Sequence, residues 1–238
     1  MIEIGEVTVP AATVARLPYY LRALRDLTRE GVATTSSSEL AERSGVGPAQ
    51  LRKDLSYLGS FGTRGVGYDV DSLSSYIAAA LGLGSEHRLA IVGVGNLGHA
   101  LANYSGYAAR GFQLVALLDA DPAVVGRTAA GLPVEHVDDL ESILADRDVS
   151  MVILATPGSA AQPVAERIVA CGVREILSFS PVALQLPDDV VVRSVDVAGE
   201  LQILAFHAAA RNAQQAQRVG ADGVAAPDGV VAPPASAR

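Results

Sequence analysis

Three glycines at G-x-G-x-x-G spacing constrain the fold of this chain more than any other feature. Gly93, Gly95 and Gly98 follow an apolar run and precede a helical pattern that we expect to span 97–109. A second apolar run follows and ends on Asp119, 21 residues beyond the third glycine. A strand, a glycine turn, a helix and an acidic strand end in this order predict a dinucleotide-binding βαβ unit of a doubly wound parallel sheet.

Each residue of the glycine turn has a physical task in such a unit. Gly93 permits the tight turn, Gly95 lets backbone N–H groups approach a pyrophosphate, and Gly98 lets the helix lie close to the sheet. The helix N-terminus, at Asn96 and Leu97, directs the positive end of its dipole toward the phosphates. We therefore predict that these five residues contact the cofactor.

The acidic strand end and two later loops complete the predicted cofactor site. The carboxylate of Asp119 accepts hydrogen bonds from an adenosine ribose and repels a 2′-phosphate, which favours NAD(H) over NADP(H). Thr156 and Pro157, and Ser180 and Pro181, follow later strands, at the carboxyl ends where open parallel sheets bind ligands. These loops carry no carboxylate, and a dry pocket of that kind favours the neutral ring of NADH over the charged ring of NAD⁺.

The rest of the sheet domain, expected over 85–195, follows from apolar runs. We expect strands near 149–155, 175–179 and 190–195, with helices that begin near Leu140 and Ala161.

The residues before the sheet, 10–84, predict a helix-turn-helix domain of the winged type. A helix over 12–30 is followed by Ser36 and Glu39 at capping-box spacing, and Pro48 opens a further amphipathic helix. Two short helices joined by a turn that contains glycine are typical of a helix-turn-helix, and the second helix buries Leu51, Leu55 and Leu58.

The second helix of this pair directs polar side chains of the kinds that bind DNA away from its core. A glycine-rich segment after it predicts a hairpin, or wing, that carries a further arginine toward a minor groove. Spacing alone leaves a solvated helical hairpin followed by a loop as the alternative. The predicted DNA-binding residues are Gln50, Arg52, Lys53, Ser56, Tyr57 and Arg64.

Charge is unevenly distributed along the chain. The formal net charge is −8, but 10–65 carries eight basic and five acidic residues, which gives +3 there and leaves −11 for the rest. Lys53 is the only lysine of the chain. Such asymmetry is typical of a small DNA-binding module attached to an acidic ligand-binding domain.

The C-terminal part predicts one helix and a tail. Apolar residues cover so much of the girth of a helix over 196–217 that we expect it to be buried on more than one side, as packing between two subunits would achieve. Residues 218–238 are rich in Ala, Gly and Pro without periodicity, and we expect a disordered tail there.

The successive motifs resemble those of the Rex family of redox-sensing transcriptional repressors. The resemblance covers about 10–208, and its most specific part is QLRKDLSYLGSFGTRGVGYDV. It implies a homodimer with a winged-helix domain at each N-terminus, a Rossmann-type domain that binds NADH or NAD⁺, and a C-terminal helix swapped onto the partner subunit. It further implies that NADH releases the protein from palindromic operator DNA.

The resemblance also implies which residues couple the two sites. Arg16, Tyr104 and Asp196 are expected to meet across domains and subunits. The sequence departs from the usual family pattern at His99, which follows the last fingerprint glycine, and at Ser178, where asparagine is usual.

Two other classes of function remain open from the residues themselves. A small NAD-dependent dehydrogenase would need a His, Lys or Tyr general acid or base over the nicotinamide and a substrate-binding subdomain, for which the chain lacks room. A nucleotide-binding protein of the coenzyme A type would share the sheet without reading redox state. We expect a protein that is not an enzyme and has no catalytic residue and no metal ligand.

Two further features indicate the compartment. No apolar run approaches the roughly 18 residues that span a bilayer, and the acidic start differs from a basic signal peptide, so we expect a cytoplasmic protein with no membrane partner. Cys171 is the only cysteine, and its apolar surroundings predict a packing role.

Overall fold

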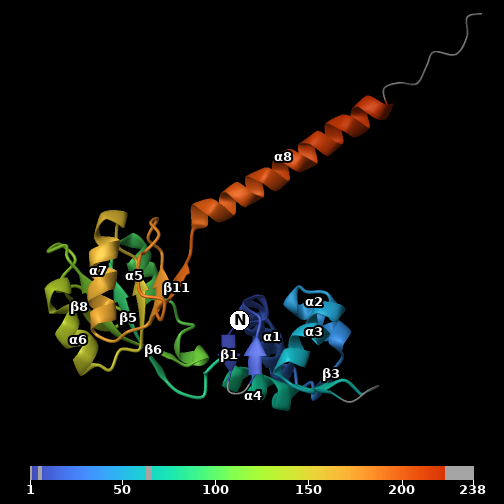
Figure 1. Cartoon of the computed structure of the whole chain (residues 1–238), viewed down its shortest axis with the longest axis horizontal. Helices are drawn as coiled ribbons and strands as arrows, with labels where there is room; N and C mark the ends of the chain where they lie inside the picture. Colours follow the sequence, from blue (N-terminus) through green and yellow to red (C-terminus); the bar gives the residue numbers. More distant parts are fainter. Residues whose placement is uncertain (1, 5–6, 63–65, 223–238) are drawn as a thin grey trace, which may run out of the picture.

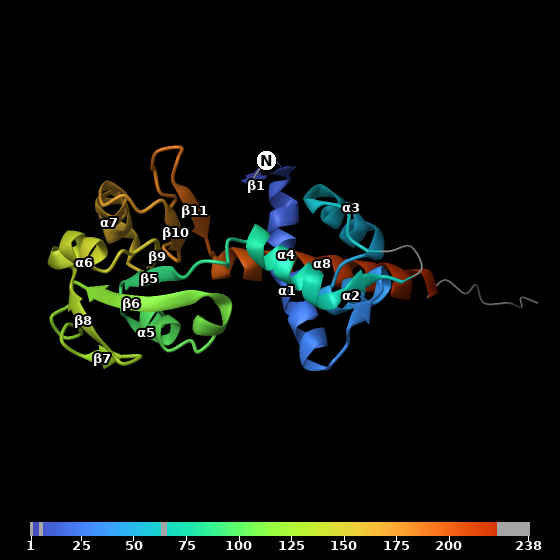
Figure 2. The same ribbon diagram turned by 90° about the horizontal axis from the view of Figure 1, so that it is seen from below.

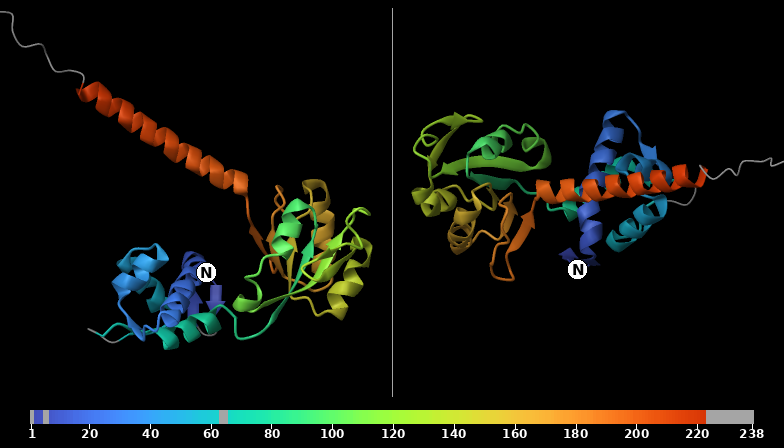
Figure 3. Two further views of the ribbon diagram at one scale, coloured as in Figure 1. Left: turned by 180° about the vertical axis from the view of Figure 1, so that it is seen from behind. Right: turned by 90° about the horizontal axis from the view of Figure 1, so that it is seen from above.

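The computed structural model describes residues 2–4, 7–62 and 66–222. A helical domain at the N-terminal end is followed by a domain built on one mostly parallel sheet (Figure 1). After the last strand a single helix, α8 (Val197–Asp222), projects away from both domains (Figure 3).

The helical domain encloses its own core. Side chains of its four helices, among them Leu17, Leu24, Leu40, Leu51 and Ile77, are fully buried there. Its elements are β1 (Ile2–Ile4), β2 (Val7–Val9), α1 (Ala11–Arg29), β3 (Thr34–Thr35), α2 (Ser37–Ser44), α3 (Pro48–Leu58), β4 (Tyr68–Asp69) and α4 (Val70–Ala80).

Local signals at α2 and α3 confirm the predicted helix pair. The Oγ of Ser36 accepts a hydrogen bond from the backbone N of Glu39 at 3.1 Å, which caps α2. Gly45 ends that helix in the left-handed conformation, with φ of +70°, and Pro48 occupies the first turn of α3. The three leucines predicted to face inward, Leu51, Leu55 and Leu58, are at most 3% exposed.

The segment predicted as a wing is described only at its base. Strands β3 and β4 pair antiparallel, and Gly67, beside them, has φ of +100°. A Cβ at that position would collide with the backbone carbonyl of Thr35, so glycine is required. The predicted tip of the wing, 63–65 with Arg64, lies outside the described residues.

The sheet has the strand order of a dinucleotide-binding fold. The order β11-β10-β9-β5-β6-β8-β7 places the first strand, β5, in the centre, and every pairing except that of β7 with β8 is parallel. The strands are β5 (His87–Val92), β6 (Phe112–Asp119), β7 (Thr128–Ala129), β8 (Leu132–His136), β9 (Met151–Leu154), β10 (Glu175–Ser178) and β11 (Val191–Ser194).

Helices cover the two faces of this sheet unequally. Helices α6 (Leu140–Asp146) and α7 (Gly158–Ala170) pack on one face, and the short α5 (Asn96–Ala102) lies on the other (Figure 2). On the α5 side, Met151 and Leu177 are only partly buried.

Several predicted boundaries were wrong. The helix expected over 97–109 ends at Ala102. The side chain of Asn103 donates to the His99 carbonyl at 2.9 Å at this end, and turns follow up to a short 3-10 helix, η1 (Ala108–Arg110). The pairing of β7 with β8, and a second 3-10 helix, η2 (Val137–Asp139), were not predicted.

Two predicted helix ends also differ. Helix α7 begins at Gly158, three residues earlier than expected, directly after Pro157. Helix α8 continues to Asp222, five residues into the segment expected to be a disordered tail, while residues 223–238 lie outside the described part.

Candidate dinucleotide and DNA-binding sites

A cavity of about 490 Å³ lies at the carboxyl ends of the central strands. Strand order reverses between β5 and β9, which is the switch point where open parallel sheets bind ligands. Five of the predicted cofactor residues line the cavity: Gly93, Gly95, Asp119, Thr156 and Pro157. Its other lining residues are Val92, Ala120, Asp121, Val124, Val137, Ala155, Ala160 and Val164.

Two of the three fingerprint glycines, Gly93 and Gly98, have the conformational roles predicted for them. Gly93 has φ of +94°, and a Cβ there would lie 2.6 Å from the carbonyl oxygen of Ala155. A Cβ on Gly98 would collide with the backbone of Gly93, so glycine allows α5 to approach the strand. A Cβ on Gly95 would meet no atom within 4 Å, which leaves open space on the cavity side of that residue.

Asp119 also shapes the loop that carries the glycines. One carboxylate oxygen accepts a hydrogen bond from the Val94 backbone N at 2.5 Å, and the other accepts from the Asp121 backbone N at 2.8 Å. A carboxylate has about four acceptor positions, so both oxygens keep capacity for a ribose. The spacing of Asp119 predicted its place at the cavity but not this second role.

The two later loops lie against each other and hold unpaired hydroxyls. A Cβ on Gly158 would lie 3.6 Å from the ring of Pro181, which places the loop after β9 beside the loop after β10. The Oγ1 of Thr156 and the Oγ of Ser180 are buried and have no hydrogen-bond partner within the described chain. Buried polar groups in proteins are normally hydrogen-bonded, and Thr156 lines the cavity, so its hydroxyl fits a polar ligand group; Ser180 lies outside the cavity lining.

The other predicted cofactor residues lie outside the cavity lining. Asn96 and Leu97 are exposed at the start of α5, and Pro181 is exposed beyond the second loop. Ser178, where the sequence departs from the usual family residue, is fully buried, and its Oγ accepts from the Ser180 backbone N at 3.2 Å. The hydroxyl therefore holds the second loop in shape.

The predicted DNA-facing residues of α3 are exposed except Tyr57, which is half-buried. Arg52 donates to the Oγ of Ser37 on α2 at 3.1 Å, and Ser56 donates to the Lys53 carbonyl at 2.7 Å. Gln50 stands in the first turn of α3, the part of a recognition helix that contacts base edges in helix-turn-helix proteins.

Asp54 is a buried carboxylate that sequence analysis missed. It is fully buried on α3, and its oxygens accept hydrogen bonds from Thr13, Arg16, Tyr20 and Gln50 at 2.6 to 2.9 Å. Burial alone would raise the pKa of Asp54, but the hydrogen bonds outweigh it and lower the pKa to about 2. This network joins α3 to α1. Its only indication in the sequence is an acidic residue, Asp54, among the inward-facing leucines of α3.

The three predicted coupling residues do not meet within one chain. Both guanidinium contacts of Arg16 go to Asp54, at 2.6 and 2.8 Å. Tyr104 is 48% exposed and packs edge-to-face on Tyr107 with a centroid distance of 5.1 Å. Asp196 caps α8 by accepting from the Gly199 backbone N at 3.0 Å.

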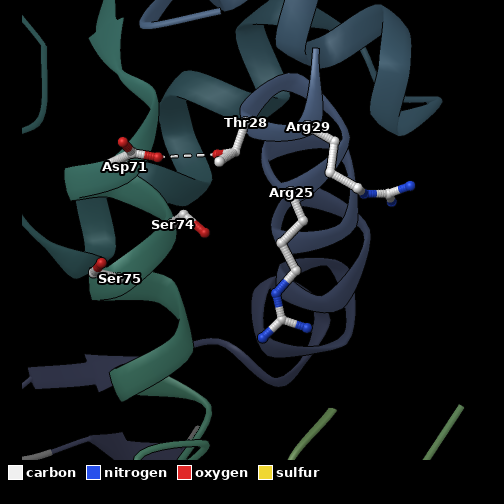
Figure 4. Close-up of a pocket in the computed structure, with 6 residues that line it drawn as sticks. All are labelled: Arg25, Thr28, Arg29, Asp71, Ser74 and Ser75. Atoms are coloured by element: carbon white, nitrogen blue, oxygen red, sulfur yellow. Dashed lines mark hydrogen bonds between the residues drawn. The ribbon is translucent and has the colours of Figure 1, made fainter. Parts of the chain in front are cut away.

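Two cavities border the exposed arginines of α1. One of about 660 Å³ lies between α1 and η1 and is lined by Arg22, Arg25 and Arg110. The other, of about 440 Å³, lies between α1 and α4, where Thr28 donates to Asp71 at 3.0 Å (Figure 4). Arg25 and Arg29 point in different directions there, so they do not converge on one anion (Figure 4).

A third cavity, of about 400 Å³, lies on the less covered face of the sheet. Leu89, Tyr107, Met151 and Leu177 contribute to its lining. The first ten residues of α8 carry uncovered apolar side chains: Val197, Leu201, Ile203, Leu204 and Phe206 are each more than half exposed. The chain therefore exposes two apolar surfaces of the kind that subunit interfaces bury.

The histidines and the cysteine contact neighbouring residues of the chain. His87 contacts the Gly82 carbonyl, His99 lies beside Asn103, His136 contacts Asp138, and His207 packs on Phe206 in α8. Burial raises the pKa of the Cys171 thiol, in keeping with a packing role. Within 2–4, 7–62 and 66–222, no cluster of three metal-ligating side chains occurs, and no helix is long and apolar enough to cross a membrane.

The fold and the two sites define a class of protein in which a helix-turn-helix domain precedes a dinucleotide-binding domain. Family models agree: one described as a putative DNA-binding protein N-terminus matches residues 8–56, and one described as a CoA binding domain matches residues 85–182. The chain belongs to the Rex family of redox-sensing transcriptional repressors.

Relatives and solved structures support this assignment over most of the chain. The redox-sensing transcriptional repressor Rex of Streptomyces coelicolor is 55% identical over 219 residues, covering 92% of this chain and 84% of the relative. Rex of Desulfitobacterium hafniense is 43% identical and covers 86% and 98%. Among solved structures, the chain is similar to RSP, a Rex-family repressor, in complex with β-NAD⁺ and operator DNA. The alignment has a TM-score of 0.80 at 33% identity and covers 93% of this chain and 100% of RSP. RSP with β-NADH aligns with a TM-score of 0.79 at 32% identity, covering 89% and 100%.

Proposed function

We propose that this chain is a redox-sensing transcriptional repressor that binds operator DNA and is released when NADH binds. One observation carries the proposal: the same chain contains a cavity at the switch point of the sheet and a helix-turn-helix with exposed cations. Its family relatives carry the name of repressors, and RSP has been crystallised with NADH, and with NAD⁺ and operator DNA.

The residues present fit a nicotinamide dinucleotide. The open space beside Gly95 suits the pyrophosphate, Asp119 suits the adenosine ribose, and the unpaired hydroxyls of Thr156 and Ser180 suit the carboxamide end. When bound, the dinucleotide supplies a ring whose charge differs between NAD⁺ and NADH. The loops that these hydroxyls occupy, 156–158 and 180–181, add no carboxylate to stabilise the positive ring, so NADH is the tighter ligand.

The protein acts as a sensor rather than as a catalyst. The lining of the switch-point cavity includes no His, Lys or Tyr that would transfer a proton beside a nicotinamide. The same cavity is compatible with a coenzyme A-type nucleotide, which the family model of residues 85–182 names. Fluorescence of bound NADH separates the two, since only a nicotinamide site enhances it.

The active form is a cytoplasmic homodimer in which α8 packs on the partner subunit. The exposed apolar side chains of α8 and the less covered face of the sheet support this arrangement. A dimer with a two-fold axis places two copies of α3 about one helical turn of DNA apart, or a multiple of it, and reads a palindrome.

The DNA-contacting surface of α3 consists of Gln50, Arg52, Lys53, Ser56 and Tyr57. Arg64, which lies outside the described residues, adds a further contact. Replacing Arg52 and Lys53 together with alanine tests this, because both are exposed cations of α3. We expect loss of operator binding in a mobility shift with NADH affinity unchanged. Replacing Arg174, on the sheet domain, with alanine is the matched control and should leave operator binding intact. Normal operator binding by the double variant would refute the assignment.

Coupling between the sites uses Arg16, Tyr104 and Asp196 across the dimer. Arg16 gives Asp54 two of its five N–H donors, so the other three remain for such a contact in the dimer. The variants Arg16→Ala, Tyr104→Phe and Asp196→Ala should each change the NADH concentration that releases operator. If all three release DNA at the wild-type concentration, the coupling lies elsewhere in the interface.

A further inference from the structure

Asp54 and Gln50 connect the buried core of the helical domain to its predicted DNA-binding surface. Asp54 is 0% exposed, whereas Gln50, one turn earlier on α3, is exposed. The Nε2 of Gln50 donates to the Oδ1 of Asp54 at 2.9 Å. The carboxylate thus holds a side chain that stands at the solvent boundary.

This hydrogen bond fixes which end of the Gln50 amide faces outward. Asp54 is ionised at neutral pH because four side chains donate to it, and an ionised carboxylate can only accept. The amide nitrogen of Gln50 must therefore face Asp54. The Oε1 and one remaining N–H of the amide are left for another partner.

We propose that Asp54 is a positioning residue that fixes the orientation of the Gln50 amide, so that Gln50 presents its carbonyl oxygen to the major groove and reads adenine. In that groove an acceptor selects the exocyclic amino groups of adenine and cytosine. Adenine alone adds the N7 acceptor beside its amino group, which the remaining N–H of Gln50 can bond. The inference rests on the proposed function, since it requires α3 to lie in the major groove.

The test is a competition assay in which each base of one operator half-site is replaced by the other three. For the wild-type dimer we expect one position to prefer adenine by about tenfold or more, and Gln50→Ala should abolish the preference there alone. Asp54→Asn places an amide opposite Gln50. Arg16 donates to both oxygens of Asp54, so either end of the new amide can face Gln50, and the Gln50 nitrogen is no longer held inward. The adenine preference should then fall about tenfold, toward guanine or thymine.

A matched control separates positioning from a purely structural role. Thr13 donates to the same Oδ1 of Asp54 at 2.9 Å but lies on α1, away from Gln50. Thr13→Val should weaken the network and leave the order of base preference unchanged. If Asp54→Asn lowers affinity for all sequences equally and keeps the adenine preference, Asp54 is only structural and the inference is wrong.

A second variant keeps the test decisive if Asp54→Asn does not fold, as judged by circular dichroism and NADH fluorescence. Gln50→Glu removes the donor that Asp54 accepts and places a second carboxylate beside it, so like-charge repulsion should displace the side chain at position 50 and abolish the adenine preference. An adenine preference retained by Gln50→Glu would overturn the inference. The two proposals fail separately. Operator binding that survives Arg52→Ala with Lys53→Ala contradicts the placement of α3, whereas base preference unmoved by Gln50→Ala contradicts only the role of Gln50.

Discussion

Two glycines of the same motif are required for different reasons. Gly98 is needed for the fold, because a Cβ there would strike the backbone of Gly93. Gly95 has extended backbone with φ of −65°, which other residues adopt, and its Cβ would meet no protein atom. The fold therefore does not demand glycine at position 95, which agrees with the proposed role of Gly95 at the pyrophosphate.

This difference makes a prediction at the residue scale. Gly95→Ala should fold with wild-type stability and lose at least tenfold in NADH affinity, because its methyl group enters the space assigned to the pyrophosphate. NADH fluorescence and thermal unfolding measure the two effects. Gly98→Ala is the contrasting variant and should lower stability. NADH binding at wild-type affinity by Gly95→Ala would show that the pyrophosphate lies elsewhere.

Asp54 gives a prediction for pH. Its pKa is lowered from 3.8 to about 2 in the folded state, so its ionised form stabilises the protein. That contribution, about 2 kcal/mol, is fully present above the unfolded pKa near 4 and is lost as pH falls through about 2.

The check compares urea unfolding of wild type and Asp54→Asn between pH 7 and pH 2. The wild type should be more stable at pH 7 by about 3 kcal/mol, because the variant leaves Arg16 with an uncompensated charge, and the difference should shrink toward pH 2. A stability difference that is independent of pH would show that the charge of Asp54 is not the cause.

At the scale of elements, sequence patterns gave the helices and central strands and missed features set by single contacts. The period of α1 and α3, the cap at Ser36 and the strand-glycine-helix order of β5 and α5 are local signals, and the structure confirms them. The apolar pattern did not reveal the early end of α5 at Ala102 or the turns that follow it.

The candidate sites were predictable to different degrees, because local patterns indicate some of their residues and not others. Motif spacing identified the glycines and Asp119, since the βαβ unit fixes their positions relative to the cavity. Three partners of Asp54, namely Thr13, Arg16 and Tyr20, lie 34 to 41 positions away in the sequence, and no local pattern predicts such pairings.

Helix α8 carries the prediction at this scale. Leu201 and Leu204 are 60% and 61% exposed in the single chain, more apolar surface than a free helix in water normally shows. Replacing both with glutamate should convert the proposed dimer to a monomer in light scattering and weaken operator binding. Gln202→Glu adds charge to the same exposed helix and should leave the dimer intact. A double variant that remains dimeric would exclude α8 from the interface.

At the scale of the whole molecule, one ligand must change the affinity of a distant surface for DNA. NADH achieves this only if it binds the DNA-incompetent form more tightly, and a shift from mostly one form to mostly the other takes about 5.5 kcal/mol. Two NADH sites in a dimer would share that free energy, so each needs to supply about half of it. We propose that the contacts of Arg16, which donates to Asp54 in the single chain, are one place where the two forms differ.

The most direct test of the account is operator binding by the wild-type chain with NADH and NAD⁺ titrated separately. We predict that NADH releases the DNA and that NAD⁺ at the same concentration leaves it bound, with an excess of NAD⁺ raising the NADH concentration needed. The Gly95→Ala variant should bind the same DNA and fail to respond to NADH. Release by both dinucleotides at equal concentrations, or by neither, would contradict the assignment of this chain as a sensor of the NADH/NAD⁺ ratio.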